Sequence, residues 1–209
     1  MRSLLPFLPV ALPCIVANAQ SGPGGVGSAA NNVLWLGADN GVTLAAGNVS
    51  NWNDRSGNTN HAFSPAPASR PLLATGALNG YPIITFDGTN DELRVPDVNQ
   101  LDLLQWDAFL VGAVNNAKAN NVWFAKGTNA QPNFGLWSPL NNALQMPIYD
   151  IFGLFSNPAT GANTMTGTFN VLEYNNTVLL GLFPSRTIYK NNNNIYNHCN
   201  SQNTPINHC

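Results

Sequence analysis

Acidic side chains are the residues of this chain that could break bonds. Hydrolysis of a sugar linkage needs two carboxyl groups facing one glycosidic bond, about 5 Å apart for retention and further apart for inversion. On a strand, this requires acids two or four residues apart on one face. The candidate acids Asp107, Asp150 and Glu173 are isolated in their segments, and no Glu-x-Asp-x-x-Glu run occurs. The sequence therefore favours a non-catalytic protein, with a glycoside hydrolase that uses these acids as the alternative.

Histidine and glycine motifs offer little further chemistry. The histidines are His61, His198 and His208, and no Gly-x-Ser-x-Gly turn presents a serine nucleophile. The glycines between Gly24 and Gly27 follow no strand-like run and precede no Lys-Ser/Thr pair. They therefore do not form a phosphate loop.

Oxygen ligands gather in one turn, at Asp87, Asn90 and Asp91. Calcium takes six to eight oxygens, from carboxylates and backbone carbonyls of such loops. The Asp-Gly-Thr-Asn sequence is also good turn chemistry, and two acids leave most ligand positions unfilled. We favour a structural turn; no cofactor is required, and calcium is the ion that these residues would suit.

Short apolar runs must position these side chains. From Val33 on, runs such as VLWL, PIITF, AFLVGAV, NVWFAK and TVLLGLF recur between Gly, Asn, Asp and Pro. Runs of this length, bounded by turn residues, are typical of antiparallel sandwich strands. We therefore predict an all-β fold of two antiparallel sheets, with one short helix over 99–106.

Three segments give sharper local predictions. Residues 109–114 are apolar or small at both parities, which predicts a central strand covered on both faces. Residues 84–95 join two runs across the turn at 87–90, which predicts a hairpin. The polar stretch 49–63 is interpreted as a structural loop anchored in the core by Trp52, in preference to a ligand-binding loop.

The first nineteen residues have the features of a signal peptide. Arg2 precedes an apolar run, and Ala17-Asn18-Ala19 fits the small-x-small cleavage rule. The run is too short to span a bilayer. We therefore predict cleavage after Ala19, a flexible Gly/Ser leader over 20–31, and a mature chain at the cell surface or outside the cell with no membrane span.

Charge and cysteines further restrict the function. The chain has 8 basic and 10 acidic side chains, and removal of the signal peptide takes away one base, Arg2, which leaves a balance of −3. Nucleic acid is therefore excluded as a partner, because phosphate binding needs a clustered basic face. In an oxidising compartment we expect Cys199 and Cys209, in an irregular tail over 198–209, to form a disulfide or stay as loose thiols. A zinc site in the repeated Asn-His-Cys is the less favoured interpretation, since adjacent ligands point to opposite sides of an extended chain.

Three segments in order carry a resemblance to a known family: NNVLWLGADNGVT (31–43), VSNWNDRSGNTNHAF (49–63) and GYPIITFDGTNDELRV (80–95). They resemble the laminin G-like, concanavalin A-like jelly-roll domains in secreted proteins of Bacteroidetes-type bacteria. Further on, WDAFLVGAV, VWFAKGTN and RTIYKNNNNIYN are similar to the middle strands and the late turn of that family. The resemblance covers about 32–197 and implies a jelly-roll β-sandwich there.

The late part of the chain departs from this pattern. Asn192 stands where the late turn usually has glycine, which is tolerable because asparagine adopts positive φ more readily than most residues. No closing strand with a short amphipathic segment follows, and no C-terminal sorting domain. We therefore expect an incomplete C-terminal end, as in a fragment of a longer protein.

The resemblance implies binding, of a glycan or another extracellular surface partner in cell adhesion. Sugar rings would lie on aromatic side chains while amides bond their hydroxyls, and some domains of this family bind calcium at a rim. The aromatic candidates are Trp106, Trp123, Trp137 and Tyr149, each expected to be buried more readily than exposed. A polysaccharide hydrolase and a purely structural segment of a larger surface protein are the alternatives.

Overall fold

The computed structural model describes residues 22, 30–114, 121–128, 131–138, 144, 148–149, 155–156, 160, 167–179 and 183–199. The described part is all-β, with antiparallel sheets and only the short 3₁₀ helices η2 (Pro67–Ser69) and η3 (Asn99–Leu101). The predicted all-β antiparallel fold class is confirmed. The helix expected over 99–106 is the single turn η3. The chain divides into two compact units, 1–97 and 98–209.

The first unit contains one five-stranded sheet, in the order β1-β2-β4-β5 with β3 paired to β2. Its strands are β1 (Val42–Ala45), β2 (Asn48–Trp52), β3 (Ala62–Phe63), β4 (Leu72–Leu78) and β5 (Tyr81–Thr85). The β4–β5 turn has φ values of 51° at Asn79 and 84° at Gly80. Positive φ at both central residues is the geometry that Asn-Gly hairpins prefer.

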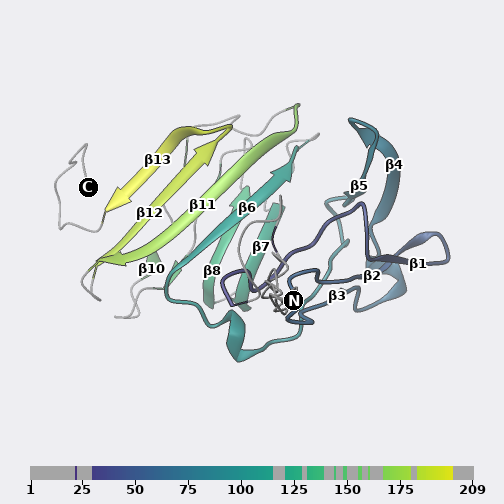
Figure 1. Ribbon diagram of the computed structural model, residues 1–209, viewed down its shortest axis with the longest axis horizontal. Coiled ribbons are helices and arrows are strands. Elements are labelled where there is room, and N and C mark those ends of the chain that lie inside the picture. The colour runs from purple at the N-terminus through teal and green to yellow at the C-terminus, as the bar shows by residue number, and fades with distance from the viewer. Residues whose placement is uncertain are drawn as a thin grey trace, which may run out of the picture. The chain divides into compact units, whose positions relative to one another are not determined.

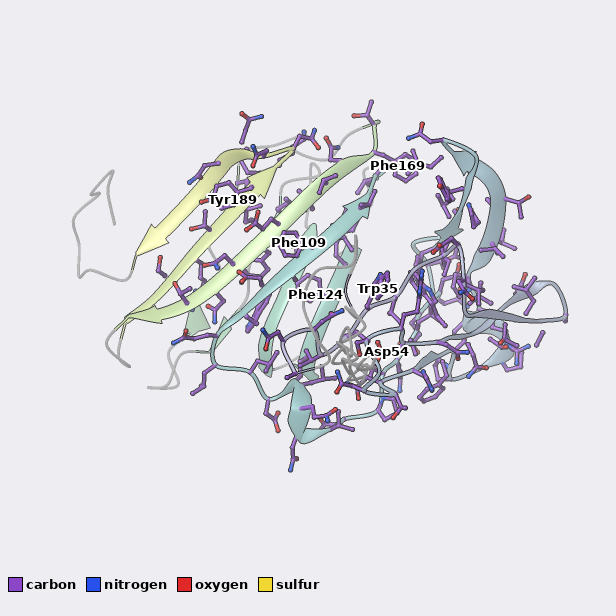
Figure 2. All side chains as sticks on the ribbon, in the orientation of Figure 1. Trp35, Asp54, Phe109, Phe124, Phe169 and Tyr189 are labelled. Atoms are coloured by element: carbon purple, nitrogen blue, oxygen red, sulfur yellow. The ribbon has the colours of Figure 1, made fainter. Side chains whose placement is uncertain are left out.

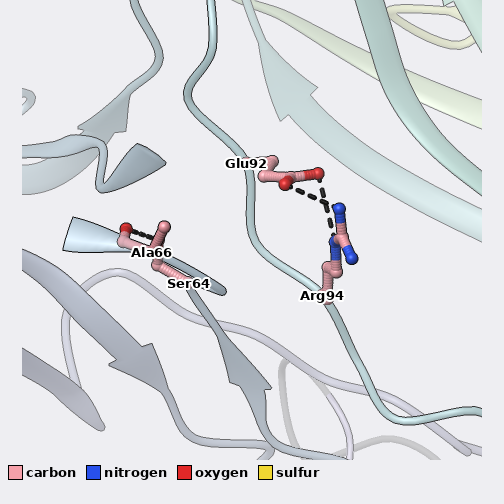
Figure 3. A network of polar contacts seen from close by, with 4 residues as sticks. All are labelled: Ser64, Ala66, Glu92 and Arg94. Atoms are coloured by element: carbon pink, nitrogen blue, oxygen red, sulfur yellow. Dashed lines mark hydrogen bonds and ion pairs between the residues drawn. The ribbon is translucent and has the colours of Figure 1, made fainter. Parts of the chain in front are cut away.

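The hairpin predicted over 84–95 is wrong. β5 pairs backward with β4, while Arg94 forms an isolated antiparallel bridge with Phe63. The two residues exchange backbone hydrogen bonds of 2.9 and 2.8 Å. The Asn79-Gly80 turn takes β5 as its second strand, so the following residues leave the hairpin and pair with β3 instead. Beside this bridge, the Arg94 guanidinium donates to both carboxylate oxygens of Glu92, and the Ser64 hydroxyl donates to the carbonyl of Ala66 (Figure 3).

The second unit contains two four-stranded antiparallel sheets, in the orders β13-β12-β11-β6 and β10-β9-β8-β7. Figure 1 shows the strands of the first sheet side by side in front of β7 and β8. The first sheet consists of β6 (Trp106–Gly112), β11 (Asn170–Leu179), β12 (Phe183–Lys190) and β13 (Asn193–Cys199). The second consists of β7 (Asn121–Thr128), β8 (Gln131–Ser138), β9 (Ile148–Tyr149) and β10 (Phe155–Ser156).

Both sheets of the second unit contribute to one hydrophobic core. The buried members are Val114, Leu136, Leu144, Leu172, Tyr174 and Ile188, and Trp106, Leu110, Trp123, Phe124 and Ile195 pack against them. A shared apolar interior of this kind defines a β-sandwich. On the inner face of β6, a Cβ at Gly112 would run into the indole ring of Trp123, so glycine gives the ring room to pack.

The late turn of the second unit bears out the argument about asparagine. Asn191 and Asn192 connect β12 to β13 with φ values of 48° and 65°. The Asn191 side chain also ties this turn to β11: its Oδ1 accepts from the Val171 N–H at 2.9 Å, and its Nδ2 donates to Asn170 Oδ1 at 2.9 Å. The asparagines therefore supply both the backbone conformation and the anchoring contacts.

No helix in the described ranges has the length and apolar character needed to cross a membrane.

Candidate binding face

The sheet β13-β12-β11-β6 has a buried face and an open one. Along β11, Leu172 and Tyr174 are buried in the core, whereas Val171 and Glu173, which alternate with them, lie on the opposite side. This period of two is the signature of a strand with one covered face. We call the side away from the core the outer face.

Strand register arranges the outer face in rows. In the middle row, Phe109 of β6 lies opposite Glu173 of β11, which lies opposite Tyr189 of β12. A second row joins Asp107, Asn175 and Thr187 in the same way, and a third joins Val111 to Val171. Directly opposed residues in an antiparallel pair have Cβ atoms about 5 Å apart. The rows therefore combine aromatic, apolar, acidic and amide groups on one surface.

Apolar side chains on this face are open to solvent. Phe109 is 68% exposed, Val111 59% and Val171 49%. Figure 2 shows Phe109 and Tyr189 on this sheet. Contiguous exposed apolar groups rimmed by polar ones mark interaction sites. The geometry makes the outer face the candidate site of the second unit.

The prediction of a central strand covered on both faces at 109–114 is wrong. β6 is the last strand in its sheet, and the alternate residues Phe109 and Val111 are exposed. Residues on both faces of this strand are apolar because those on one face pack in the core, while Phe109 and Val111 on the other face form the exposed patch. Asp107, two residues before Phe109 and on the same face, is the sequence signal that this face is wet.

The acids of the hydrolase alternative are partly brought together. Asp107 on β6 lies opposite Asn175 on β11. Glu173 lies two residues from Asn175 on the same strand and face, so it is a diagonal neighbour of Asp107. Diagonal neighbours of this kind lie about 7 Å apart. Asn175 Nδ2 donates to Asp107 Oδ1, which fixes one carboxylate. Asp150 lies outside the described residues.

Two of the tryptophans proposed as sugar platforms, Trp106 and Trp123, pack against the core. Trp106 and Trp123 are half-buried there, and the Trp106 ring meets Tyr174 edge-on with centroids 4.6 Å apart. The backbones of Trp137 and Tyr149 belong to β8 and β9, but their side chains lie outside the described set. Sequence reasoning missed the outer-face aromatics Phe109 and Tyr189, because it valued tryptophan in apolar runs over residues that alternate with polar ones.

The proposed calcium ligands form a closed turn. Asp87 Oδ1 accepts backbone N–H groups from Thr89 at 2.7 Å, Asn90 at 3.1 Å and Asp91 at 3.3 Å. Asp91 Oδ2 accepts from the Asp87 N–H at 2.8 Å, and Asn90 Nδ2 donates to the Ala68 carbonyl at 2.7 Å. These bonds stabilise the turn. In the part of the chain that the structure describes, no group of three or more His, Cys, Asp or Glu side chains is arranged to hold a metal.

A buried carboxylate organises the loop at 49–63 in the first unit. Asp54 Oδ1 accepts from the Trp35 N–H and the Ser56 N–H, both at 2.9 Å, and its Oδ2 accepts from the Ser56 hydroxyl at 2.7 Å and the Asn60 N–H at 3.0 Å. Figure 2 labels Trp35 and Asp54 within this unit. Asp54, Ser56 and Asn60 are buried, and we call this set with Trp35 the Asp54 hub.

Electrostatics at the hub favour the ionised acid. Burial raises the pKa of Asp54, but the hydrogen bonds from Trp35, Ser56 and Asn60 together outweigh it and hold that pKa below its ordinary value. Near the hub, Trp52 Nε1 donates to the Gly37 carbonyl at 2.9 Å, and the Arg55 guanidinium lies 4.1 Å from the centre of the Trp35 ring. These groups bond to the protein's own chain, so the loop has a structural role.

The cysteines of the predicted disulfide are described only in part. β13 ends at Cys199, so the strand continues two residues into the predicted tail at 198–209. Cys209 lies outside the described residues, and the disulfide stays a prediction.

Comparison with protein-family models, with curated proteins and with solved structures finds no match for this chain.

Proposed function

We propose that this chain is an exported, non-catalytic β-sandwich module that binds carbohydrate through the outer face of its second unit. We further propose that it is a laminin G-like, concanavalin A-like jelly roll, on the basis of the sequence resemblance. The single observation that carries the binding proposal is the row Phe109, Glu173 and Tyr189, in which two aromatic side chains flank a carboxylate on an open sheet.

The chemistry of the face suits sugars. One side of a pyranose ring is apolar and packs on an aromatic ring, while its hydroxyls need acceptors and donors beside that ring. Glu173 supplies acceptor oxygens in the row, and Asn175 and Thr187 in the next row supply both donors and acceptors. A signal peptide would deliver such a module to where extracellular glycans are found.

A binding assay with matched variants tests this proposal. The purified chain is incubated with insoluble and soluble polysaccharides, and bound protein is measured by pull-down and calorimetry. Phe109→Ala is expected to weaken glycan binding about tenfold, since burial of a phenylalanine side chain contributes about 1.5–3 kcal/mol. The control is Leu104→Ala, because Leu104 is 72% exposed in the same unit and belongs to neither sheet. Equal loss in both variants would refute a role for the outer face.

A glycoside hydrolase is the second candidate, supported by the diagonal placement of Asp107 and Glu173 on this face. Two carboxyl groups at such a separation resemble the spacing that inverting enzymes use to leave room for water. The test is release of reducing sugar from laminarin, agar and xylan. Release that Glu173→Gln abolishes while glycan binding persists would replace the binding proposal with the hydrolase. If the parent chain and every variant bind glycan but release no reducing sugar, the hydrolase hypothesis is refuted.

A further inference from the structure

The described side chains of the outer face carry negative charge, from Asp107 and Glu173. Among the outward positions of the described strands β6, β11 and β12, the charged residues are Asp107 and Glu173. The cations of β12 occupy the opposite parity: Arg186 is buried, and Lys190 pairs with the buried Leu172. The position of β13 beside Tyr189 is held by the neutral Asn194.

The aromatic groups of the middle row are spaced for a chain of sugars. Phe109 and Tyr189 lie on β6 and β12, with β11 and Glu173 between them. Neighbouring strands are about 4.8 Å apart, so the backbones at Phe109 and Tyr189 lie about 10 Å apart across the sheet. A pyranose unit is about half that length, so a glycan running perpendicular to the strands would place alternate sugars on the two aromatic side chains and the sugar between them over Glu173.

We infer, building on the proposed function, that the outer face binds an uncharged glycan of at least three sugars laid across β6, β11 and β12, and that it discriminates against glycans bearing carboxylate or sulfate groups. Hydroxyl groups can donate to Glu173 and Asp107, and hydrogen bonds to charged acceptors are the stronger ones. A carboxylate on the sugar can donate nothing, and at about 4 Å from Glu173 its repulsion weakens binding about fivefold even in a watery environment.

Chemically matched glycan pairs test the inference. The chain is titrated calorimetrically with polygalacturonate and its carboxyl-reduced form, and with soluble glucan and its carboxymethylated form, at low and physiological salt. We expect the uncharged member of each bound pair to bind at least about fivefold more tightly at low salt. The difference should shrink as salt rises, because the Debye length falls from about 30 Å at 0.01 M to about 8 Å at 0.15 M.

The outcomes separate this inference from the proposed function. If a glycan binds but its acidic member binds equally or more tightly, the selectivity is refuted and the binding function stands. If no member of any pair binds, both are refuted. Trisaccharides that bind no more tightly than single sugars would refute the two-ring geometry alone.

A charge-neutral variant locates the selectivity. Glu173→Gln keeps the shape of the side chain but replaces a charged acceptor with a neutral one, so uncharged glycans should bind about fivefold more weakly. Because the repulsion of acidic glycans is also removed, we expect the preference for the uncharged member of each pair to fall about fivefold. Glu92→Gln, in the first unit, makes the same change in net charge and is expected to leave that preference unchanged. An equal fall of the preference in the two variants would assign the selectivity to net charge and refute the inference. Asp107→Asn repeats the comparison in the second row.

Discussion

Replacing Asp54 with alanine tests whether one carboxylate holds the first unit together. The substitution removes the acceptor for three backbone N–H groups, of Trp35, Ser56 and Asn60, and for the Ser56 hydroxyl. A buried donor left without a partner costs about 1 kcal/mol or more. These four bonds together predict a loss of about 3–4 kcal/mol in the free energy of unfolding of this unit.

Native-state hydrogen exchange of peptides covering residues 30–63 measures the loss in the first unit alone. The control is Asp39→Ala, which removes one exposed ion pair with Arg55 at 2.9 Å and should cost at most about 0.5 kcal/mol. If the two variants exchange alike, the carboxylate does not organise the loop and the argument fails.

Acid should act through the same group. The pKa of Asp54 is lower in the folded chain than its ordinary value, so the folded state binds this proton less readily than the unfolded state. The stabilisation is therefore fully present above the unfolded pKa, about 3.9, and is lost as the pH falls through the lower folded pKa. In Asp54→Asn this part of the acid sensitivity should disappear from exchange profiles recorded between pH 6 and pH 2. An unchanged profile would contradict the assignment.

Substitutions at three further positions probe other features. Gly112→Ala should lower the free energy of unfolding by about 1–3 kcal/mol, because the new Cβ is forced against the Trp123 ring. The loss would be measured as a lower urea midpoint of the second unit, and an unchanged midpoint would show that the ring has room. Asn191→Ala should lower the free energy of unfolding by about 2 kcal/mol, because it removes two side-chain hydrogen bonds to β11 and leaves alanine at positive φ. Asn191→Asp should recover the hydrogen bond from the Val171 N–H and with it part of the stability. If it recovers none, that contact is contradicted. Glu92→Gln should change the melting temperature negligibly, since its ion pair with Arg94 is exposed, and a large drop would mean that the pair is structural.

The sequence predicted the fold class well because turn residues and short apolar runs are local signals. Strand pairing was harder to predict, as residues 84–95 show. The Asn79-Gly80 turn makes β5 pair with β4, and the periodicity within a single apolar run does not reveal which neighbouring run it pairs with. The turn chemistry at Asn192 needed only the known tolerance of asparagine for positive φ, and that prediction held.

The candidate site was harder to predict because it depends on register. Asp107 and Glu173 are 66 positions apart in the numbering, and only the pairing of β6 with β11 places them on one face. Phe109 was misassigned because the sequence pattern of an apolar residue in a strand is the same whether a second layer of structure covers that residue or it is exposed. Trp106 was a binding candidate because of its size but was expected to be buried more readily than exposed, and its parity does direct it towards the core.

The asparagine contacts beside the Asp54 hub limit how far the amino-terminal end can be trimmed. Residues 32–37 belong to no strand, yet Asn58 Nδ2 donates to the Asn32 carbonyl at 3.0 Å and Asn60 Nδ2 to the Val33 carbonyl at 2.8 Å. Removal of Asn32 and Val33 would deprive these two loop amides of their acceptors, so we expect the stability of the first unit to fall once trimming of the chain passes Asn32.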